Sequence, residues 1–469
     1  MPRGPIAGYL VGIGLLYTYL LAGPAARVLI GSRLPAGFAS LTSVFGSDGV
    51  RAVLFTLSYG LWIAVFVWCL RRLTFQQISR KSVFAWAIVF AVLLLAFPPH
   101  FSDDIIGYAQ YGRIMAHYGA NPYIHTLSEF NDAWAQHRRY WAALPSPYGP
   151  VMNLVFAAAA WIGGESLVAT VVVLKIVMTG CYLFSGWCIA NIIRQLQPQA
   201  EVRSAFFFLW NPLVLLEVLA QGHNDAVMIA VTLAGLLLIV RNRFTHGYIA
   251  LVVGALTKVA TIVILPLYIG FLIVRREYKS LLIGSLASAL LLFLAWWSWY
   301  REPGAFSGIL TVSRLSWRSP VWLAQRAGAQ LGLNSARVGV YLQVLVVLFI
   351  AIFFAVRAKR IRSHKSFLGE SALATAMFLL VISTQINTWY LALLVALAAT
   401  SLDSLTETIA VAVTTWPIVL YFRFWLYSTE LWVPAVQTVI LYTVLAAFLI
   451  AYARRTIKSR QLSLTALSV

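Results

Sequence analysis

Two adjacent carboxylates, Asp103 and Asp104, follow an apolar run that ends at a predicted membrane edge. Asp104 opens a predicted amphipathic helix, and the same face carries, at helical spacing, Tyr108, Tyr111, Met115 and Tyr118. A carboxylate beside aromatic hydroxyls in a poorly hydrated place has its pKa raised toward that of a useful general base. The structural alternative is that Ser102 caps the helix and the acids complement its dipole. The spacing favours catalysis by Asp104, with Asp103 as its neighbour.

A second polar group interrupts the apolar stretch WNPLVLLEVLAQGHNDAV, residues 210–227. Glu217 is predicted inside a membrane helix, where an ionisable side chain costs roughly 2.5–3.5 kcal/mol and therefore indicates function. His223, Asn224 and Asp225 follow at the break between two predicted spans. Capping of the next helix by Asn224 and Asp225 is the structural alternative. One His beside one Asp is a weak metal signature, so we expect no metal site.

Three more groups could contact an anionic or sugar-bearing substrate. Lys258 interrupts ALTKVATIVILP, where its ammonium suits a phosphate or simply reaches the interface. Arg314 and Arg318 stand four residues apart among tryptophans in a predicted outer loop, where they suit a lipid phosphate or interface anchoring. Trp389 and Tyr390 open a predicted span, and such rings serve either as interface anchors or as platforms for sugar rings.

The composition places the elements that carry these residues in a membrane. Apolar residues make up 61% of the 469-residue chain and charged residues only 11%, against about 25% in soluble domains. The net charge of +20 comes mostly from short basic clusters between apolar runs, as the positive-inside rule requires. We therefore expect membrane lipids, and no nucleic acid, around this protein.

Apolar stretches of about 20 residues predict an all-α integral membrane protein with about 13–14 transmembrane helices. The short run 150–164 is expected to lie in the interface or to re-enter, because it is short for a span. The expected spans are 6–23, 51–70, 83–98, 167–191, 204–220, 225–240, 280–299, 337–357, 369–384, 388–402, 405–424 and 434–453, with a helical hairpin over 247–273 that breaks at Lys258.

Basic residues between positions 71 and 81 orient this topology, because Lys and Arg accumulate in cytoplasmic loops. Both termini are then cytoplasmic, and residues 99–166 and 300–336 lie outside. We expect residues 1–469 to form one polytopic domain with an outer catalytic loop at 99–166. The candidate residues converge on the outer face, which suggests a substrate with an apolar tail and an anionic head.

Four motifs resemble those of a known family. The run SDDIIGYAQYGRIMAHYGANPY resembles the acidic-loop signature of the polyprenyl-phosphate-mannose-dependent α-mannosyltransferases, in the C-type glycosyltransferase superfamily. NPLVLLEVLAQGHNDAVMIA is similar to the second signature of that family, ALTKVATIVILP to its third, and NTWYL to a late motif. The chain departs from the family at 106–107, where Ile-Gly replaces an aromatic residue and an arginine, and at Tyr111, where an acid is frequent.

The resemblance implies a C-type glycosyltransferase architecture and an inverting, metal-independent transfer without a cofactor. The donor would be a polyprenyl-phosphate sugar carrying mannose or a related unit, and the acceptor a glycolipid or glycan, at the outer face of the plasma membrane. The family's catalytic aspartate stands four residues before a tyrosine, which Asp104 and Tyr108 match. The expected substrate-binding set is Tyr108, Arg113, Asn121, Tyr148, Glu217, His223, Asn224, Asp225, Lys258, Arg314, Arg318, Trp389 and Tyr390.

Two rival functions also fit a chain with many spans and buried ions. A transporter or flippase for lipid-linked sugars is the first, although such proteins often carry inverted repeats with broken helices near the midplane, and no repeat is visible here. A scaffold for lipid synthesis is the second, and it predicts that Asp103 and Asp104 tolerate alanine.

Overall fold

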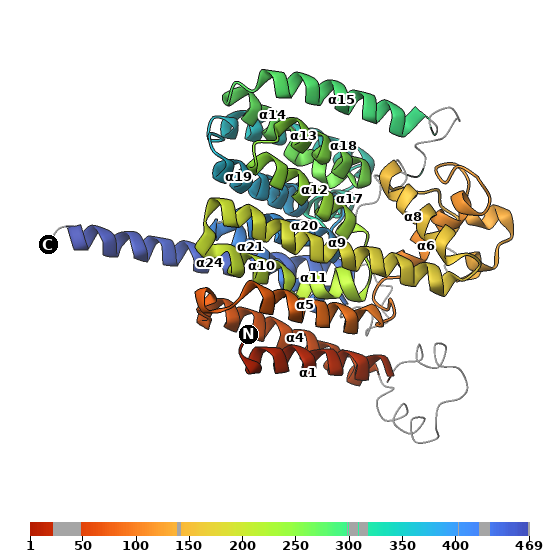
Figure 1. The fold of residues 1–469 in the computed structure, drawn as a ribbon, viewed down its shortest axis with the longest axis horizontal. Helices are drawn as coiled ribbons and strands as arrows, with labels where there is room; N and C mark the ends of the chain where they lie inside the picture. Colours follow the sequence, from red (N-terminus) through yellow and green to blue (C-terminus); the bar gives the residue numbers. More distant parts are fainter. Residues whose placement is uncertain are drawn as a thin grey trace.

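The computed structural model of the chain describes residues 1–21, 48–137, 142–297, 299, 308, 318–401, 403–421 and 432–467. Every regular element in these ranges is a helix. Most of the helices run side by side in one bundle (Figure 1). The predicted all-α integral membrane class is therefore confirmed.

Different elements lie at the two ends of the bundle. The N-terminus and the C-terminal helix α24 lie at one end, whereas α6 and α8 lie at the other (Figure 1). The N-terminus and the end of α24 therefore lie on the same side of the bundle. The first part of the chain forms α1 (Arg3–Leu21), α4 (Asp48–Arg72), α5 (Arg80–Leu95), α6 (Asp104–Ala116), η3 (Leu127–Phe130), η4 (Ala133–Gln136), α8 (Pro150–Gly163) and α9 (Leu167–Leu196).

The middle of the chain supplies the broken helices. Pro212 restarts the chain after α10 with its fixed φ, and Lys258 separates two apolar helices. These elements are α10 (Glu201–Leu209), α11 (Pro212–Val214), the π-helix η6 (Leu215–Ala220), α12 (Asp225–Val240), α13 (Phe244–Thr257), η7 (Val259–Val263), α14 (Ile264–Val274) and α15 (Tyr278–Trp297). The predicted hairpin over 247–273 is confirmed as α13, η7 and α14.

The last part completes the bundle and covers the middle elements. It comprises α17 (Pro320–Gln330), α18 (Ser335–Ala358), α19 (His364–Met377), the π-helix η8 (Phe378–Ile382), η9 (Thr388–Tyr390), α20 (Leu391–Ser401), α21 (Ser404–Thr414), α22 (Trp416–Tyr421) and α24 (Trp432–Leu467). Helix α20 is buried along its whole length and packs against α10, α12 and α19. It therefore forms the centre of the core.

Among the described residues, seven helices are long and apolar enough to cross a bilayer, or eight if the bent pair 198–209 and 212–220 counts as one span. This is fewer than the 13–14 expected. Part of the difference arises because four segments expected to span form shorter helices: Asp225–Val240, Phe244–Thr257, Val259–Val274 and Thr388–Ser401. The apolar segments lie where the sequence predicts them, but breaks in the backbone divide them into helices shorter than a full span.

Helix α8 has the exposed apolar side that a helix in the membrane interface needs. It is 14 residues long, below the length of a full span. Leu154, Trp161 and Ile162 are strongly exposed, whereas the opposite side packs on α6 and α9. This arrangement agrees with the interfacial position expected for residues 150–164.

Candidate functional site

Helix α6 holds Asp104 as its first residue. The expected amphipathic pattern is wrong, because nearly all of α6 up to Ile114 is buried, with α8 and α9 packed against it. A Cβ at Gly112 would lie 2.1 Å from the carbonyl oxygen of Phe156 in α8, so glycine is required for this close approach. Asp104 is buried, whereas Asp103 is exposed. The structure therefore distinguishes the two carboxylates that the sequence could not.

The segment before α6 is held by a side chain that sequence reasoning missed. The amide oxygen of Gln221 accepts hydrogen bonds from the backbone N–H groups of His100, Phe101 and Ser102, at 3.0, 2.8 and 3.2 Å. Three donors on one oxygen fix this extended segment against the end of η6. Ser102 also accepts from the N–H of Asp104, at 3.3 Å, which retains part of its expected capping role.

His223 lies between two carboxylates from different parts of the chain. Its Nδ1 is 3.9 Å from Oδ2 of Asp104, and its Nε2 is 3.3 Å from Oε2 of Glu217. The indole of Trp389 stacks on the imidazole with ring centroids 4.0 Å apart and planes 14° apart. All the polar members are buried, and Trp389 is half-buried. The imidazole is thus held in a dry, rigid slot.

Glu217 sits on the π-helix η6 and is 0% exposed. The hydroxyl of Tyr421 donates to both carboxylate oxygens of Glu217, at 2.7 and 2.9 Å. π-helical turns are rare and occur often at functional sites. Here the π turn places Glu217 beside His223, six residues later.

Lys258 and the residues at the start of α12 form a second group of polar side chains. The ammonium of Lys258 lies 2.7 Å from Oδ2 of Asp225 and donates to Oδ1 of Asn224 at 3.3 Å. It also lies 4.7 Å from the ring centroid of Tyr390, in cation–π geometry. Asn224 makes no side-chain cap on α12, and its oxygen faces Lys258 and Tyr108 instead. The capping alternative therefore does not account for Asn224, nor interface snorkelling for Lys258.

Aromatic side chains pack around Asp104 and its neighbours. The hydroxyl of Tyr108 lies 3.5 Å from Nδ1 of His223 and donates to Asn224 at 3.4 Å. The ring of Tyr108 stacks on Phe156 at 4.8 Å and meets Tyr148 edge-on at 5.3 Å. These rings keep bulk water from the carboxylate of Asp104.

The electrostatics of the site suit a proton acceptor. Burial raises the pKa of Asp104, and the nearby charges of His223 and Lys258 only partly oppose this effect. An aspartate with a raised pKa is a stronger base than one in water. The position of Asp104 and the direction of its pKa shift therefore both suit a general base.

We name the cluster Asp104, Tyr108, Glu217, His223, Asn224, Asp225, Lys258, Trp389 and Tyr390 the polar cluster. Its members come from α6, η6, the start of α12, the break after α13, and η9. All nine were candidates from the sequence. Long-range packing brings them together, since as many as 286 positions, from 104 to 390, separate them along the chain.

Other sequence candidates lie elsewhere. Arg113 is ion-paired with Asp132 and, at 2.8 Å, with Glu165, and its guanidinium lies 4.4 Å from the ring of Trp134. It stands nine residues beyond Asp104, about 14 Å along the helix. These contacts make Arg113 a structural residue that ties α6 to the segment 127–165. Its partner Asp132 is 19 positions away in the sequence, so the residues around Arg113 do not reveal this ion pair.

The remaining candidates described by the structure are not members of the polar cluster. The side-chain oxygen of Asn121 accepts from the N–H of Tyr123 at 3.0 Å, which is a turn within the outer segment. Tyr148 packs on the polar cluster through Tyr108. Arg318 directly precedes Ser319, whose hydroxyl donates to the carbonyl of Thr384 at 2.7 Å, so it borders the segment leading to Trp389. Arg314 lies outside the described residues.

A further residue that the sequence left without a role is Lys175 of α9. Its buried ammonium donates to the carbonyls of Leu94, Phe97 and Ala220, the first at 3.0 Å and the last at 3.1 Å. These carbonyls lie at the ends of α5 and η6, where helical backbone acceptors have no intrahelical donor. Lys175 therefore joins the two elements that flank the polar cluster.

Metal binding was not expected from the sequence. Within the described ranges, no three side chains of His, Cys, Asp and Glu form a group that could hold a metal ion. Metal independence of the reaction remains a prediction.

The fold and the polar cluster define a class: a polytopic membrane protein with a buried acid, imidazole and ammonium at one end of its bundle. A family model described as "Alpha-(1->6)-mannopyranosyltransferase, N-terminal domain" matches residues 13–275, from α1 to the end of α14. The chain belongs to this family. The match includes Asp104, Glu217, His223 and Lys258, whereas Trp389 lies beyond it.

Individual relatives carry the same description. The chain is 24% identical over 253 residues to alpha-(1->6)-mannopyranosyltransferase A of Mycobacterium tuberculosis, covering 52% of this chain and 49% of the relative. It is 30% identical over 161 residues to alpha-(1->6)-mannopyranosyltransferase B of Corynebacterium glutamicum, covering 34% of this chain and 26% of the relative. The chain therefore spans about half the length of the first relative it matches, and about a quarter of the second.

Proposed function

We propose that this chain is an inverting membrane mannosyltransferase that moves a mannosyl or related unit from a polyprenyl-phosphate donor to a glycolipid or glycan acceptor. Family membership supports the sugar transfer. The observation that carries the mechanism is the buried carboxylate of Asp104, placed near both His223 and Lys258 by three separate parts of the chain.

In this proposal Asp104 accepts the proton of the acceptor hydroxyl while that oxygen attacks the anomeric carbon. The bond from that carbon to the phosphate oxygen breaks on the opposite face, which inverts the configuration. General-base assistance of this kind contributes about 10²- to 10⁴-fold. His223 and Asp225 orient hydroxyl groups of the acceptor or of the donor, as members of the expected substrate-binding set.

Lys258 is the residue proposed to neutralise the leaving phosphate. A lysine ammonium has three N–H donors, and in the described part of the chain Asp225 and Asn224 accept from two of them. The third is available to a phosphate oxygen. A positive charge in a poorly hydrated site stabilises developing negative charge strongly, which is how a metal ion is dispensed with here.

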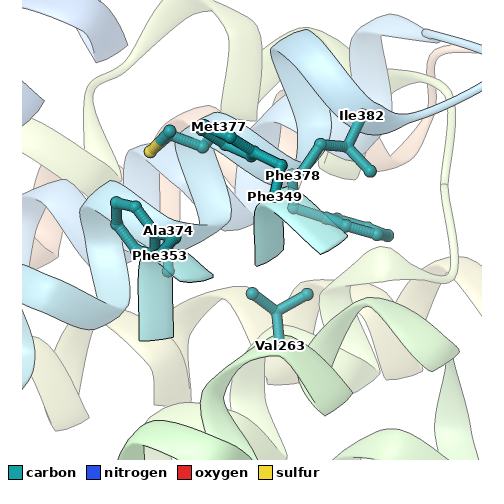
Figure 2. Close-up of a pocket in the computed structure, with 7 residues that line it drawn as sticks. All are labelled: Val263, Phe349, Phe353, Ala374, Met377, Phe378 and Ile382. Atoms are coloured by element: carbon teal, nitrogen blue, oxygen red, sulfur yellow. The ribbon is translucent and has the colours of Figure 1, made fainter. Parts of the chain in front are cut away.

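A small apolar crevice lies in the part of the bundle that follows Lys258 in the chain. Its lining side chains point into one space between η7, α18, α19 and η8 (Figure 2), and they are Val263, Phe349, Phe353, Ala374, Met377, Phe378 and Ile382. Val263 stands five residues after Lys258, and η7 joins them directly.

The orientation belongs to the proposal as well. Residues 1–469 act as one polytopic domain of the plasma membrane with both termini in the cytoplasm. The polar cluster then lies toward the extracytoplasmic face, on the side of the segment 99–166. Ion pairs such as Arg80–Glu201 and Arg203–Glu407 lie toward the cytoplasmic ends of their helices in this orientation.

The test is transfer by purified protein from radiolabelled polyprenyl-phosphate mannose to acceptors in a membrane extract. Asp104→Asn should lose at least about 100-fold in rate while expression and donor binding stay near normal. Asp403→Asn is the matched control, because Asp403 caps α21 at the far end of α20 and Asn is an equally good cap. Full activity in Asp104→Asn would remove the assignment.

The rival transporter or flippase predicts a different outcome. It would move lipid-linked sugar across proteoliposomes and form no new glycosidic bond. Measuring flux and labelled product in the same vesicles separates the two, and flux without product would replace the enzyme proposal.

A further inference from the structure

Glu217 and His223 have contacts that substrate binding does not explain. Glu217 is 0% exposed, and within the described ranges no lysine or arginine lies at ion-pair distance from it. Its oxygens face the hydroxyl of Tyr421 and Nε2 of His223, both buried. A completely enclosed carboxylate without a cation partner is a poor contact for an incoming sugar, but it is suited to hold a proton.

We propose that His223 and Glu217 form a proton relay behind Asp104, so that both are positioning residues for the general base. The two ring nitrogens of His223 face one carboxylate each, Asp104 at 3.9 Å and Glu217 at 3.3 Å. An imidazole in this position can accept a proton on one nitrogen and release another from the second. This inference rests on the proposed sugar transfer.

The proton balance is as follows. The acceptor O–H bond breaks, the proton passes to the carboxylate of Asp104, and the acceptor oxygen bonds to the anomeric carbon. Asp104 then gives a proton to Nδ1 of His223 while Nε2–H gives one to Glu217, which becomes a neutral carboxylic acid. The proton returns by the same path to the departing phosphate monoester, whose second pKa is about 6, or to water.

The neighbouring groups favour this direction of transfer. Trp389 stacks on the ring at 4.0 Å and fixes its plane, so that both nitrogens keep their orientation. Neither contact is a hydrogen bond as the structure stands: Nδ1 lies 3.9 Å from Asp104, and Nε2 lies 3.3 Å from Glu217 without forming one. Catalytic contacts of this kind shorten when substrate fills the site. Within the described ranges, the titratable groups that contact or act on His223 and Glu217 are Asp104, Tyr108, Tyr421 and Tyr59, and the ion pair of Lys258 with Asp225 lies next along the chain from His223.

The test compares Glu217→Gln, Glu217→Asp and His223→Gln with the wild-type protein. The relay predicts that Glu217→Gln lowers kcat about 10- to 100-fold, leaves KM for both substrates within about twofold, and raises the solvent deuterium isotope effect on kcat. Glu217→Asp keeps a carboxylate and should recover most of the rate. Glu370→Gln is the matched control, because Glu370 of α19 is also buried but pairs with Arg357 of α18.

Three outcomes would overturn the relay. A large rise in KM with unchanged kcat would make Glu217 a substrate contact. A loss of folded protein with unchanged kcat per folded molecule would make it purely structural. An unchanged isotope effect, or no recovery in Glu217→Asp, would exclude proton transfer through this carboxylate.

A measurement without substrate separates the relay from the proposed function. The infrared band of a protonated carboxylic acid is followed against pH in the folded protein and assigned to Glu217 by its loss in Glu217→Gln. The relay predicts that His223→Gln shifts the titration midpoint of this band. If the midpoint shifts but the protein transfers no sugar, only the proposed transferase function is wrong. If the protein transfers sugar but the midpoint does not shift, only the relay is wrong.

Discussion

Replacement of Lys258 separates two roles that the structure combines in one ammonium. Lys258 neutralises Asp225, at 2.7 Å, and in our proposal it also binds the phosphate of the donor. Lys258→Met removes both functions, because methionine has a similar length and no charge. Asp225→Asn removes the first function alone, so the pair of variants forms a cycle in which the phosphate contribution is measured by itself.

The expected magnitude follows from the position of the ammonium. Two charges about 4 Å apart interact with about 1 kcal/mol in bulk water and about 4 kcal/mol at an effective dielectric constant of 20. The side chain of Lys258 is 16% exposed, so we use about 2–3 kcal/mol for its contact with the phosphate. At one factor of ten per 1.36 kcal/mol, this predicts a loss of roughly 30- to 160-fold in kcat/KM for the donor.

The assay is a donor titration in four proteins: wild type, Lys258→Met, Asp225→Asn and the double variant. The loss caused by Lys258→Met should persist in the Asp225→Asn background. The single variant Lys258→Met should also melt at a lower temperature, since a buried carboxylate loses its cation, and the double variant should recover part of that stability. If Lys258→Met has no further effect on kcat/KM once Asp225 is neutral, Lys258 only balances charge and the phosphate assignment is wrong.

Three further expectations concern other residues. Because burial raises the pKa of Asp104, kcat/KM should fall with decreasing pH along a limb that lies above about pH 4, and a limb at or below that value would contradict the assignment. Trp389→Leu removes the ring stacked on His223 and should lower kcat about 2- to 10-fold with unchanged melting temperature. Asp132→Asn weakens the ion pair of Arg113 and should destabilise the protein by about 1–3 kcal/mol in thermal melting, with kcat per folded molecule kept.

The positions of the helices could be predicted from hydropathy because lipid requires long apolar segments. Helix α12 has the predicted bounds, 225–240, and the hairpin break falls at Lys258 as expected. The π-helix η6 could not be predicted, since a π turn differs from an α turn only in its backbone pairing and tertiary packing decides between them. The burial of α6 was also missed, because it depends on α8 and α9.

The polar cluster could be anticipated in part for a physical reason. Charged residues are scarce in an apolar chain, so His223 and Lys258 stand out, and the predicted topology puts both at the same ends of their helices. Gln221 and Tyr421 do not stand out, because a lone amide or phenol at the end of an apolar run is commonly an ordinary interface residue. Their roles come from single contacts, to the segment before α6 and to Glu217, that only the folded chain creates.

The charge count of the polar cluster links its stability to its chemistry. Asp104, Glu217 and Asp225 are three buried carboxylates, and they face one ammonium and one imidazole. Burying negative charge is costly unless a proton or a cation compensates it. Donor phosphate adds a further negative charge beside Lys258, so its arrival strengthens the demand for a proton within the cluster. The proton released by the acceptor meets this demand, which couples formation of the glycosidic bond to neutralisation of the site and gives a physical reason for a second carboxylate behind the base.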